Sequence, residues 1–368
     1  MIAPLFLLFI ALFILVWLGI TDKAMRLLAE RAGHPYNARG ARSAQVIVGL
    51  VIVLIAGYML APRIWREPPP PMLATYGPDS LWMGMDSTLI EYIGGDREDL
   101  VAYGRELIRN TAFYLGPQGT VSQHTNGMNC QNCHLEAGTK PWGNNYSAVW
   151  STYPKFRERS GGNETVMKRI NDCVERSLNG TALDSTSLEM RSLLAYMEWL
   201  GTGVPKNKKP KGVGLAELKF MERAADPVHG EVIYTAKCMR CHLPDGSGQK
   251  LPNATTYLYP PLWGKHSYNI GAGLYRLSRF AGYVKNNMPQ GVSWEKPELT
   301  DEEAWDLAAY VNSRQRPDRD LSKDWPKTAG KPADHPFGPY ADAFTEEQHK
   351  FGPFGPIAEA KAATAKPK

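Results

Sequence analysis

Two copies of one five-residue motif constrain this chain more than any other feature. Each copy reads Cys-x-x-Cys-His, and the two occupy residues 130–134 and 238–242. Two cysteines at this spacing, followed directly by histidine, are the attachment signature of a c-type haem, in which the thiols bond to the haem and the histidine ligates its iron. The sequence therefore predicts two covalently bound haem c groups. Their expected attachment residues are Cys130, Cys133, His134, Cys238, Cys241 and His242.

The same four cysteines could instead bind one zinc ion, because paired Cys-x-x-Cys knuckles form zinc sites. Against this alternative, the two pairs are more than a hundred residues apart, and both carry the trailing histidine. Haem is the favoured interpretation. Covalent haem attachment takes place outside the cytoplasm, so this interpretation also predicts that the motif-bearing part of the chain is periplasmic.

Two charge-free apolar runs near the start of the chain predict a membrane anchor. Residues 2–20 and 44–61 are each close to the length of a helix that crosses a hydrocarbon core of about 30 Å. The loop between them, residues 21–43, is expected to be cytoplasmic because it is rich in basic residues. Those residues are Lys23, Arg26, Arg31, Arg39 and Arg42. We therefore expect residues 1–66 to hold two transmembrane helices in the inner (cytoplasmic) membrane, with both ends of the anchor outside. A buried core helix is the alternative for either run.

The remainder of the chain reads as two similar helical domains followed by a strap. A helix is predicted before each motif and another one at the end of each domain, which is the architecture of a small c-type cytochrome. The predicted fold class is mainly α, with two cytochrome c-type domains in tandem. Helices are expected at residues 100–114, 165–178, 188–200, 229–234 and 274–287, and after a capping box formed by Thr300 and Glu303. The expected boundaries are 73–205 for the first domain, 212–316 for the second and 317–368 for an extended, Pro-rich strap and tail.

Composition adds three smaller expectations. The basic linker at residues 206–212 is predicted to be a solvated hinge between the domains. The last residues, 358–368, are predicted to be disordered. A formal net charge of +5 is too small to predict a nucleic-acid partner, although it leaves room for a locally basic pocket that binds anions.

The fifth cysteine, Cys173, belongs to neither motif. It lies within the helix predicted at residues 165–178, for which Asn163 is the candidate N-cap. Residues four apart share one face of a helix, so Arg169, Cys173 and Ser177 should be stacked with the thiol between a cation and a hydroxyl. An inert, buried cysteine is an equally open reading of the same pattern.

Several longer phrases resemble the thiosulfate dehydrogenase family of dihaem c-type cytochromes. They fall in the same order across both predicted domains, from about residue 73 to about residue 357, and leave the two apolar runs outside the resemblance. Besides the first motif, the phrases are YPKFRER at 153–159, NDCVERSLNG at 171–180, PPLWG at 260–264, GAG at 271–273, NMP at 287–289 and QHKFGPF at 348–354.

The resemblance implies a ligand set for the two irons. His134 and Cys173 would ligate the first iron, and His242 and Met288 would ligate the second, with lysine or asparagine as an occasional substitute for the methionine. A thiolate ligand lowers the potential of a haem iron and a methionine raises it. Electrons would then enter at the first haem and leave through the second.

The resemblance also implies a reaction and its residues. Two thiosulfate ions would be joined into tetrathionate, and two electrons would pass on to a respiratory acceptor, such as a cytochrome or a terminal oxidase. Cys173, Arg159, Arg169 and Ser177 match the catalytic positions, and the sulfur of Cys173 would leave the iron, take a covalent adduct from one thiosulfate and be attacked by the second.

Three alternatives stay open at this point. The chain could be a membrane-anchored dihaem electron carrier of a respiratory complex, without a substrate of its own. It could run the same chemistry in the direction of tetrathionate reduction. It could also resemble the haem subunit of the sulfur-oxidising pathway that conjugates thiosulfate to a carrier protein.

Overall fold

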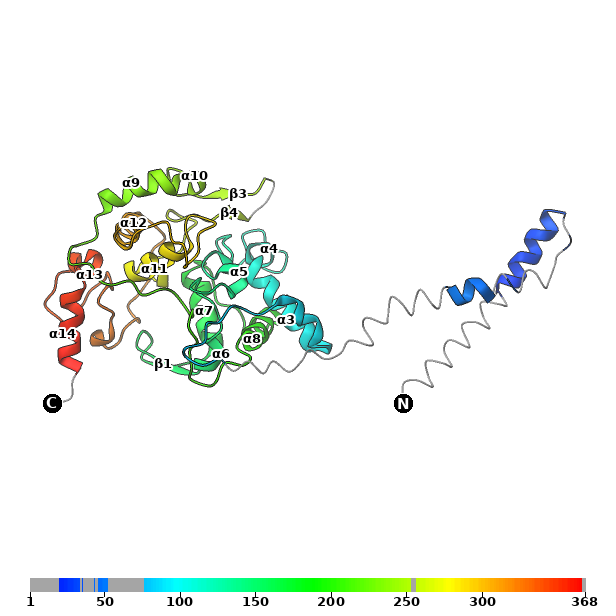
Figure 1. Cartoon of the computed structure of the whole chain (residues 1–368), viewed down its shortest axis with the longest axis horizontal. Helices are drawn as coiled ribbons and strands as arrows, with labels where there is room; N and C mark the ends of the chain where they lie inside the picture. Colours follow the sequence, from blue (N-terminus) through cyan, green and yellow to red (C-terminus); the bar gives the residue numbers. More distant parts are fainter. Residues whose placement is uncertain are drawn as a thin grey trace. The chain divides into compact units, whose positions relative to one another are not determined.

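The computed structural model divides the chain into two compact units, Met1–Pro70 and Pro71–Lys368. Figure 1 shows both units. The residues described are 20–33, 35, 43, 46–51, 76–252 and 256–365.

In the first unit, residues 20–31 and 46–51 are helical. Most of the two predicted membrane spans, residues 2–20 and 44–61, lies outside the described residues, which include only residue 20 and residues 46–51 of them. Within the described part of the chain, no helix combines the length and the apolar character that crossing a bilayer requires. The anchor therefore stays a prediction.

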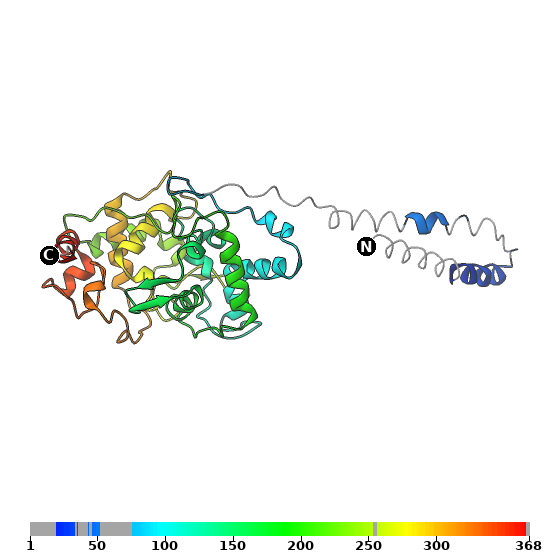
Figure 2. The ribbon, with the colours of Figure 1, turned by 90° about the horizontal axis from the view of Figure 1, so that it is seen from below.

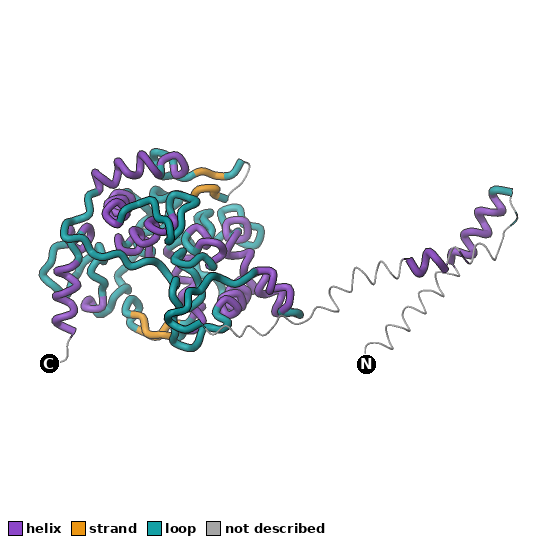
Figure 3. The backbone as a smooth tube through the Cα atoms, viewed as in Figure 1, coloured by secondary structure: helices purple, strands orange, loops and turns teal. Residues whose placement is uncertain are grey.

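The second unit is mainly helical, as predicted, and its few strands form two small hairpins (Figure 3). In its first half, α3 (Gly95–Arg109) packs against α8 (Leu188–Leu200). The strands β1 (Lys155–Arg157) and β2 (Gly162–Glu164) pair antiparallel. The other elements of this half are η1 (Ser87–Tyr92), α4 (Thr111–Leu115), η2 (Cys130–Asn132), α5 (Leu135–Gly138), α6 (Val149–Thr152) and α7 (Val166–Arg176).

The second half repeats this plan. Its leading helix α9 (Pro227–Lys237) packs against its closing helix α12 (Asp301–Ser313), which also contacts α11 (Leu277–Asn287). A second antiparallel hairpin joins β3 (Gln249–Lys250) and β4 (Tyr257–Tyr259). The remaining elements are α10 (Met239–His242), η3 (Gly273–Tyr275), η4 (Thr328–Gly330), α13 (Glu346–Phe351) and α14 (Gly355–Ala365).

One shared detail shows that the two halves use the same helix crossing. At Gly104 of α3, an added Cβ would lie 2.1 Å from the backbone oxygen of Ser192 in α8. At Gly230 of α9, it would lie 2.0 Å from the backbone oxygen of Asp306 in α12. Both separations are too short for a real Cβ, so only glycine lets each pair of helices approach this closely. Each crossing holds the leading helix of its half against the closing helix.

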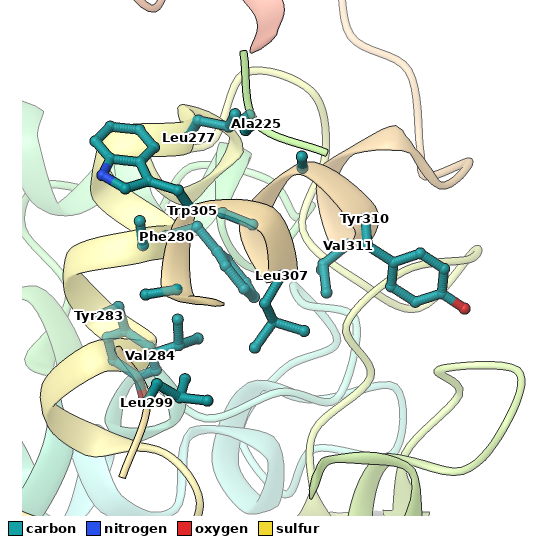
Figure 4. Packing of buried hydrophobic residues seen from close by; sticks show 14 of the residues in the cluster. Ala225, Leu277, Phe280, Tyr283, Val284, Leu299, Trp305, Leu307, Tyr310 and Val311 are labelled. Carbon is teal, nitrogen blue, oxygen red and sulfur yellow. The ribbon is translucent and has the colours of Figure 1, made fainter. Parts of the chain in front are cut away.

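The core of the second half forms where α11 and α12 meet. Figure 4 shows Phe280 and Val284 facing Trp305, Leu307 and Val311 across the two helices. The predicted capping box begins α12: the Thr300 side chain accepts from the Glu303 N–H, and the Glu303 side chain accepts from the Thr300 N–H. That prediction is confirmed.

Two helix predictions need correction. The helix predicted at residues 165–178 spans Val166–Arg176, and its N-cap is Thr165, whose side chain accepts from the Lys168 N–H. Asn163, the predicted cap, instead pairs with Phe156 in the β1–β2 hairpin. The helix predicted at 100–114 breaks at Asn110, which separates α3 from α4. The helix predicted at 188–200 is confirmed as α8.

The predicted disorder of residues 358–368 is wrong as far as Ala365. Helix α14 runs through this segment, and its residue Ile357 is fully buried together with Phe354 just before the helix. Figure 2 shows α13 and α14, in red, beside the yellow helices of the second half. Two apolar anchors followed by an alanine-rich run of high helix propensity account for the helix.

Candidate functional site

The structure brings three of the predicted haem residues together around one cavity. Cys130 and His134 of the first motif, and Cys173 of α7, line this first cavity, whose volume is about 300 Å³. Its other walls are largely apolar, which suits a flat hydrophobic cofactor. The apolar lining includes Leu107, Ile108, Leu115, Val166, Ile170, Val174, Leu183, Leu193 and Met197.

A second cavity surrounds the second motif. Cys238, Cys241, His242 and Met288 all line it, and its volume is about 920 Å³. Met288 reaches it from the C-terminal end of α11. Cys133 of the first motif lines this cavity as well, so the two candidate haem sites adjoin each other.

Both motif histidines are arranged as iron ligands. Nδ1 of His134 lies 2.5 Å from the backbone oxygen of Asn144, and Nδ1 of His242 lies 2.8 Å from that of Pro260. A carbonyl oxygen can only accept, so Nδ1 carries the proton in each ring and Nε2 keeps a free lone pair. Burial lowers the pKa of both rings, that of His134 to about 4, so both are neutral at physiological pH. The residues therefore fit two haem c groups.

The zinc alternative finds no support in the described residues. Among them, no group of three or more His, Cys, Asp or Glu side chains is close enough to hold a metal ion. Cys130 lines the first cavity, whereas Cys133, Cys238 and Cys241 line the second.

The lysine and asparagine side chains that could replace Met288 at the second iron do not line the second cavity. Nζ of Lys285 donates to the backbone oxygen of Leu299 at 2.7 Å and lies 2.8 Å from a carboxylate oxygen of Asp301. The amide of Asn287 donates to two backbone oxygens, and neither residue lines the second cavity. Lys265 is exposed and does not line it either. The geometry favours the thioether of Met288.

We expect Met288→Ala to lower the reduction potential of the second haem. A thioether favours the ferrous state, and axial ligands move haem potentials within a range of about 0.8 V, so a shift on the order of 0.1 V is expected. A spectroelectrochemical titration measures it, with Lys285→Ala as the control that should leave the potential unchanged. A shift in the control and none in Met288→Ala would identify the lysine as the ligand.

Of the other predicted catalytic residues, Arg169 is the one that the structure places at the same cavity as Cys173. It lies one helical turn before Cys173 on α7, and both side chains line the first cavity. The negative charge of an ionised Cys173 is the largest influence on the pKa of Arg169 and raises it. Arg169 therefore stays charged beside the sulfur.

The other two predicted catalytic residues do not line the first cavity. Arg159 sits in the turn between β1 and β2, where its guanidinium donates to the backbone oxygen of Gly271 at 3.3 Å and stacks 5.8 Å from the Trp325 ring. Burial, then the charges of neighbouring arginines, lowers its pKa to about 10. Ser177 is the C-cap of α7, and its N–H donates to the backbone oxygen of Cys173. The turn points Arg159 at the second half, and its catalytic role, like that of Ser177, stays a prediction.

Three cations that the sequence analysis did not single out do line the first cavity: Lys155, Arg157 and Lys209. Lys155 and Arg157 alternate along β1 and so share one face of the strand. Alternating cations in a short strand were the signal that could have identified them.

The segment that carries Lys209 is not a free hinge, contrary to prediction. The N–H of Asn207 donates to the backbone oxygen of Ser151 at 2.8 Å, and the Ser151 hydroxyl donates to that of Lys208 at 2.8 Å. The backbone oxygen of Gly212 accepts from the Asn145 amide at 2.7 Å. The linker is therefore fastened along the first half of the unit.

The second half of the unit holds the end of α7. The amide of Asn269 donates to the backbone oxygen of Glu175 at 2.9 Å, and the N–H of Asn269 donates to that of Arg176 at 3.0 Å. Two carbonyls that a helix C-terminus leaves unpaired are thus satisfied from across the unit. Arg176 itself forms a two-pronged ion pair with Asp324 of the C-terminal strap, at 2.7 Å for both contacts.

Comparison with known proteins agrees with this arrangement. The family model "SoxA/TsdA, cytochrome c domain" matches residues 120–205, and the cytochrome c model matches residues 228–315. A curated thiosulfate dehydrogenase of Allochromatium vinosum is 43% identical over 221 residues, which make up 59% of this chain and 80% of that protein. The chain belongs to the thiosulfate dehydrogenase family. Both the predicted family and the two tandem cytochrome c domains are confirmed.

Two further members of the thiosulfate dehydrogenase family illustrate the range of similarity. The enzyme of Stutzerimonas stutzeri is 36% identical over 220 residues, 59% of this chain and 69% of that protein. The solved structure of the thiosulfate dehydrogenase TsdBA from Marichromatium purpuratum matches with a TM-score of 0.56 and 32% identity. That match covers 61% of this chain and 47% of the other, so the chain spans about half of that structure.

Proposed function

We propose that this protein oxidises thiosulfate at the first cavity, joins two thiosulfate ions into tetrathionate, and passes two electrons onward through the second site. The observation that carries the proposal is the first cavity itself, in which Cys173 and Arg169 adjoin the first haem motif. A purely electron-carrying cytochrome needs no cation-lined cavity around a haem-site thiol.

Charge is the main obstacle to this reaction, because both reactants are dianions. At a separation of 5 Å they repel each other by about 3 kcal/mol in water and by about 13 kcal/mol at an effective dielectric constant of 20. The cavity offers Arg169, Lys155, Arg157 and Lys209, and the carboxylate nearest to this group is Glu164, 3.7 Å from Arg157. The lining is therefore strongly positive where the two anions must meet.

Cys173 can divide the reaction into two easier steps. In the first, its thiolate and the terminal sulfur of one thiosulfate form an S–S bond, and two electrons are released. In the second, the terminal sulfur of another thiosulfate attacks that thiosulfate-derived sulfur, tetrathionate departs, and the Cys173 thiolate is restored. Two covalently bound haem c groups supply the electron acceptors when they are attached at residues 130–134 and 238–242.

This chain's own residues perform the remaining tasks. Arg169 orients the oxyanion end of the first thiosulfate beside Cys173, since guanidinium presents paired donors to such groups. The end of α7 is fixed by Asn269 and Asp324, which keeps the sulfur in one position. Contact between the two sites through Cys133 supports onward electron transfer to the Met288 side.

We also propose that the protein acts at the periplasmic face of the inner membrane and delivers electrons to a cytochrome or a terminal oxidase. The support is the pair of apolar runs that flank the basic segment 21–43 in the sequence. A reporter that is active only in the periplasm should stay silent when it is fused within residues 21–43. Activity of that fusion would reverse the proposed topology.

The function is tested most simply with purified, fully oxidised protein under anaerobic conditions. Adding thiosulfate alone should change the haem absorbance spectrum from that of the oxidised to that of the reduced form, because the protein itself would withdraw electrons from the substrate. An electron carrier without a substrate site would stay oxidised until a partner enzyme was added, and that result would favour the carrier alternative. Adding tetrathionate to the reduced protein shows whether the reverse direction also runs.

A further inference from the structure

We propose that Lys155, Arg157 and Lys209 form a second anion subsite at the first cavity, and that this subsite holds the thiosulfate that attacks the sulfur bonded to Cys173. The inference rests on the proposed function and assigns a place to the second substrate ion. Arg169 and Cys173 make the first subsite.

The strand β1 presents two of the three cations. Lys155 and Arg157 lie on the same face and line the cavity, whereas Phe156 between them points away and is 52% exposed. The pairing with β2 fixes this orientation, since Lys155 lies opposite Glu164 and Arg157 opposite Gly162. The register of the hairpin therefore turns the side chains of Lys155 and Arg157 toward the first cavity.

The third cation comes from the linker. Lys209 lies between Lys208, whose backbone oxygen accepts from Ser151, and the buried Pro210. Because the backbone on both sides of Lys209 is held in place, its exposed side chain starts from a fixed position beside the cavity, which it lines. A free hinge could not place a charge in this way.

These cations are short of negative partners. Among the described residues, neither Lys155 nor Lys209 has a hydrogen-bond acceptor or a carboxylate within bonding distance, and Lys155 contacts only the Tyr153 ring at 4.6 Å. Arg157 has one carboxylate, Glu164, at 3.7 Å. Three cations that share one acid are suited to bind a small dianion, which neutralises them and gains charge-assisted hydrogen bonds.

The mutual repulsion of the group supports this reading. Burial, followed by the charges of Arg157, Lys209 and Arg169, lowers the pKa of Lys155 to about 8, and Glu164 opposes them only weakly. Holding these like charges close together costs electrostatic free energy when no anion is bound, and binding a dianion removes that repulsion. Side chains with this property are typical of a ligand site.

A haem propionate offers the same chemistry as thiosulfate, so the test must separate the two anions. The variant Lys155→Gln/Lys209→Gln removes two charges from the cavity. Its control, Lys208→Gln/Lys211→Gln, removes two charges from exposed neighbours in the same linker that do not line the cavity. Thiosulfate-dependent ferricyanide reduction, thermal unfolding and the first haem's potential are measured for both variants and the unmodified protein.

We expect the KM for thiosulfate to rise roughly tenfold or more in the cavity variant and to change little in the control. Thermal stability and the first haem's potential should stay as in the unmodified protein. At low thiosulfate, mass spectrometry of the Cys173 peptide should show more of the thiosulfate adduct, because its attacker arrives more slowly.

An unchanged KM together with lower thermal stability or a shifted first haem potential would assign the cations to a propionate and overturn the proposal. An equal rise in KM in both variants would reduce the effect to overall charge and also overturn it. If the double variant does not fold, the exposed Lys209→Gln alone carries the test against Lys208→Gln. Failure of the unmodified protein to oxidise thiosulfate would instead refute the proposed function.

The same subsite predicts a dependence on pH. Lys155 loses its charge as the pH rises through about 8, so the KM for thiosulfate should increase from about pH 7 to about pH 9. The groups that face it are Arg157, Arg169, Lys209, Glu164 and Tyr153. In Lys155→Gln this rise should disappear, and a rise that persists would contradict the assignment.

Discussion

Cys173→Gly is expected to abolish thiosulfate oxidation while both haem groups stay attached. Attachment depends on the cysteines at 130, 133, 238 and 241, whereas the S–S bond to substrate needs the thiolate of Cys173. Loss of a covalent nucleophile costs far more than loss of a binding contact, so a fall in turnover on the order of 10³-fold or more is expected. Haem content is measured from the pyridine haemochrome spectrum, and turnover from thiosulfate-dependent ferricyanide reduction.

Cys173→Ser is the matched control for this experiment. It is close in shape to cysteine and places an oxygen where the sulfur was, but it cannot form the S–S bond, so it should be as inactive as the glycine variant. Near-normal turnover in either variant would remove Cys173 from the chemistry. The electron-carrier alternative would then be the better description of the first haem site.

Asp324→Ala is expected to lower the free energy of unfolding by about 3–5 kcal/mol. The side chain of its partner Arg176 is only 9% exposed, and their ion pair is two-pronged. Removing the carboxylate leaves the buried guanidinium with only one other carboxylate within 4 Å among the described residues, that of Asp172 at 3.9 Å from its Nε, which costs more than the pair contributes. Because Arg176 ends α7, thiosulfate turnover should fall as well.

Chemical denaturation measures the stability of this variant. Asp318→Ala is the control, because Asp318 lies in the same strap but is exposed and forms no ion pair with the described residues. Its effect should stay within about 0.5 kcal/mol. Equal effects of the two substitutions would show that the strap is not anchored through Arg176.

Covalent chemistry made part of this protein predictable from its sequence. The attachment motifs define which residues hold a haem whatever the surrounding fold, and the first cavity indeed gathers Cys130, His134 and Cys173. Local signals were equally informative where the local structure decides the outcome: the capping box at Thr300 starts α12 as expected. These features depend on residues only a few positions apart.

Features that depend on contacts between distant segments were not predictable. Arg159 was expected beside Cys173 but bonds Gly271, more than a hundred residues away in the chain. The linker was expected to be free, yet its hydrogen bonds to Ser151 place Lys209 at the cavity. In each case the local sequence is compatible with several arrangements, and tertiary contacts select one.

The most direct test of the central claim is the stoichiometry of the reaction catalysed by the purified protein. The mechanism at Cys173 requires two thiosulfate ions consumed, one tetrathionate formed and two ferricyanide ions reduced per turnover. Thiosulfate and tetrathionate are separated by ion chromatography while ferricyanide is followed by its absorbance. We expect a ratio of 2:1:2, and ferricyanide reduction without tetrathionate, or no thiosulfate consumption at all, would contradict the account.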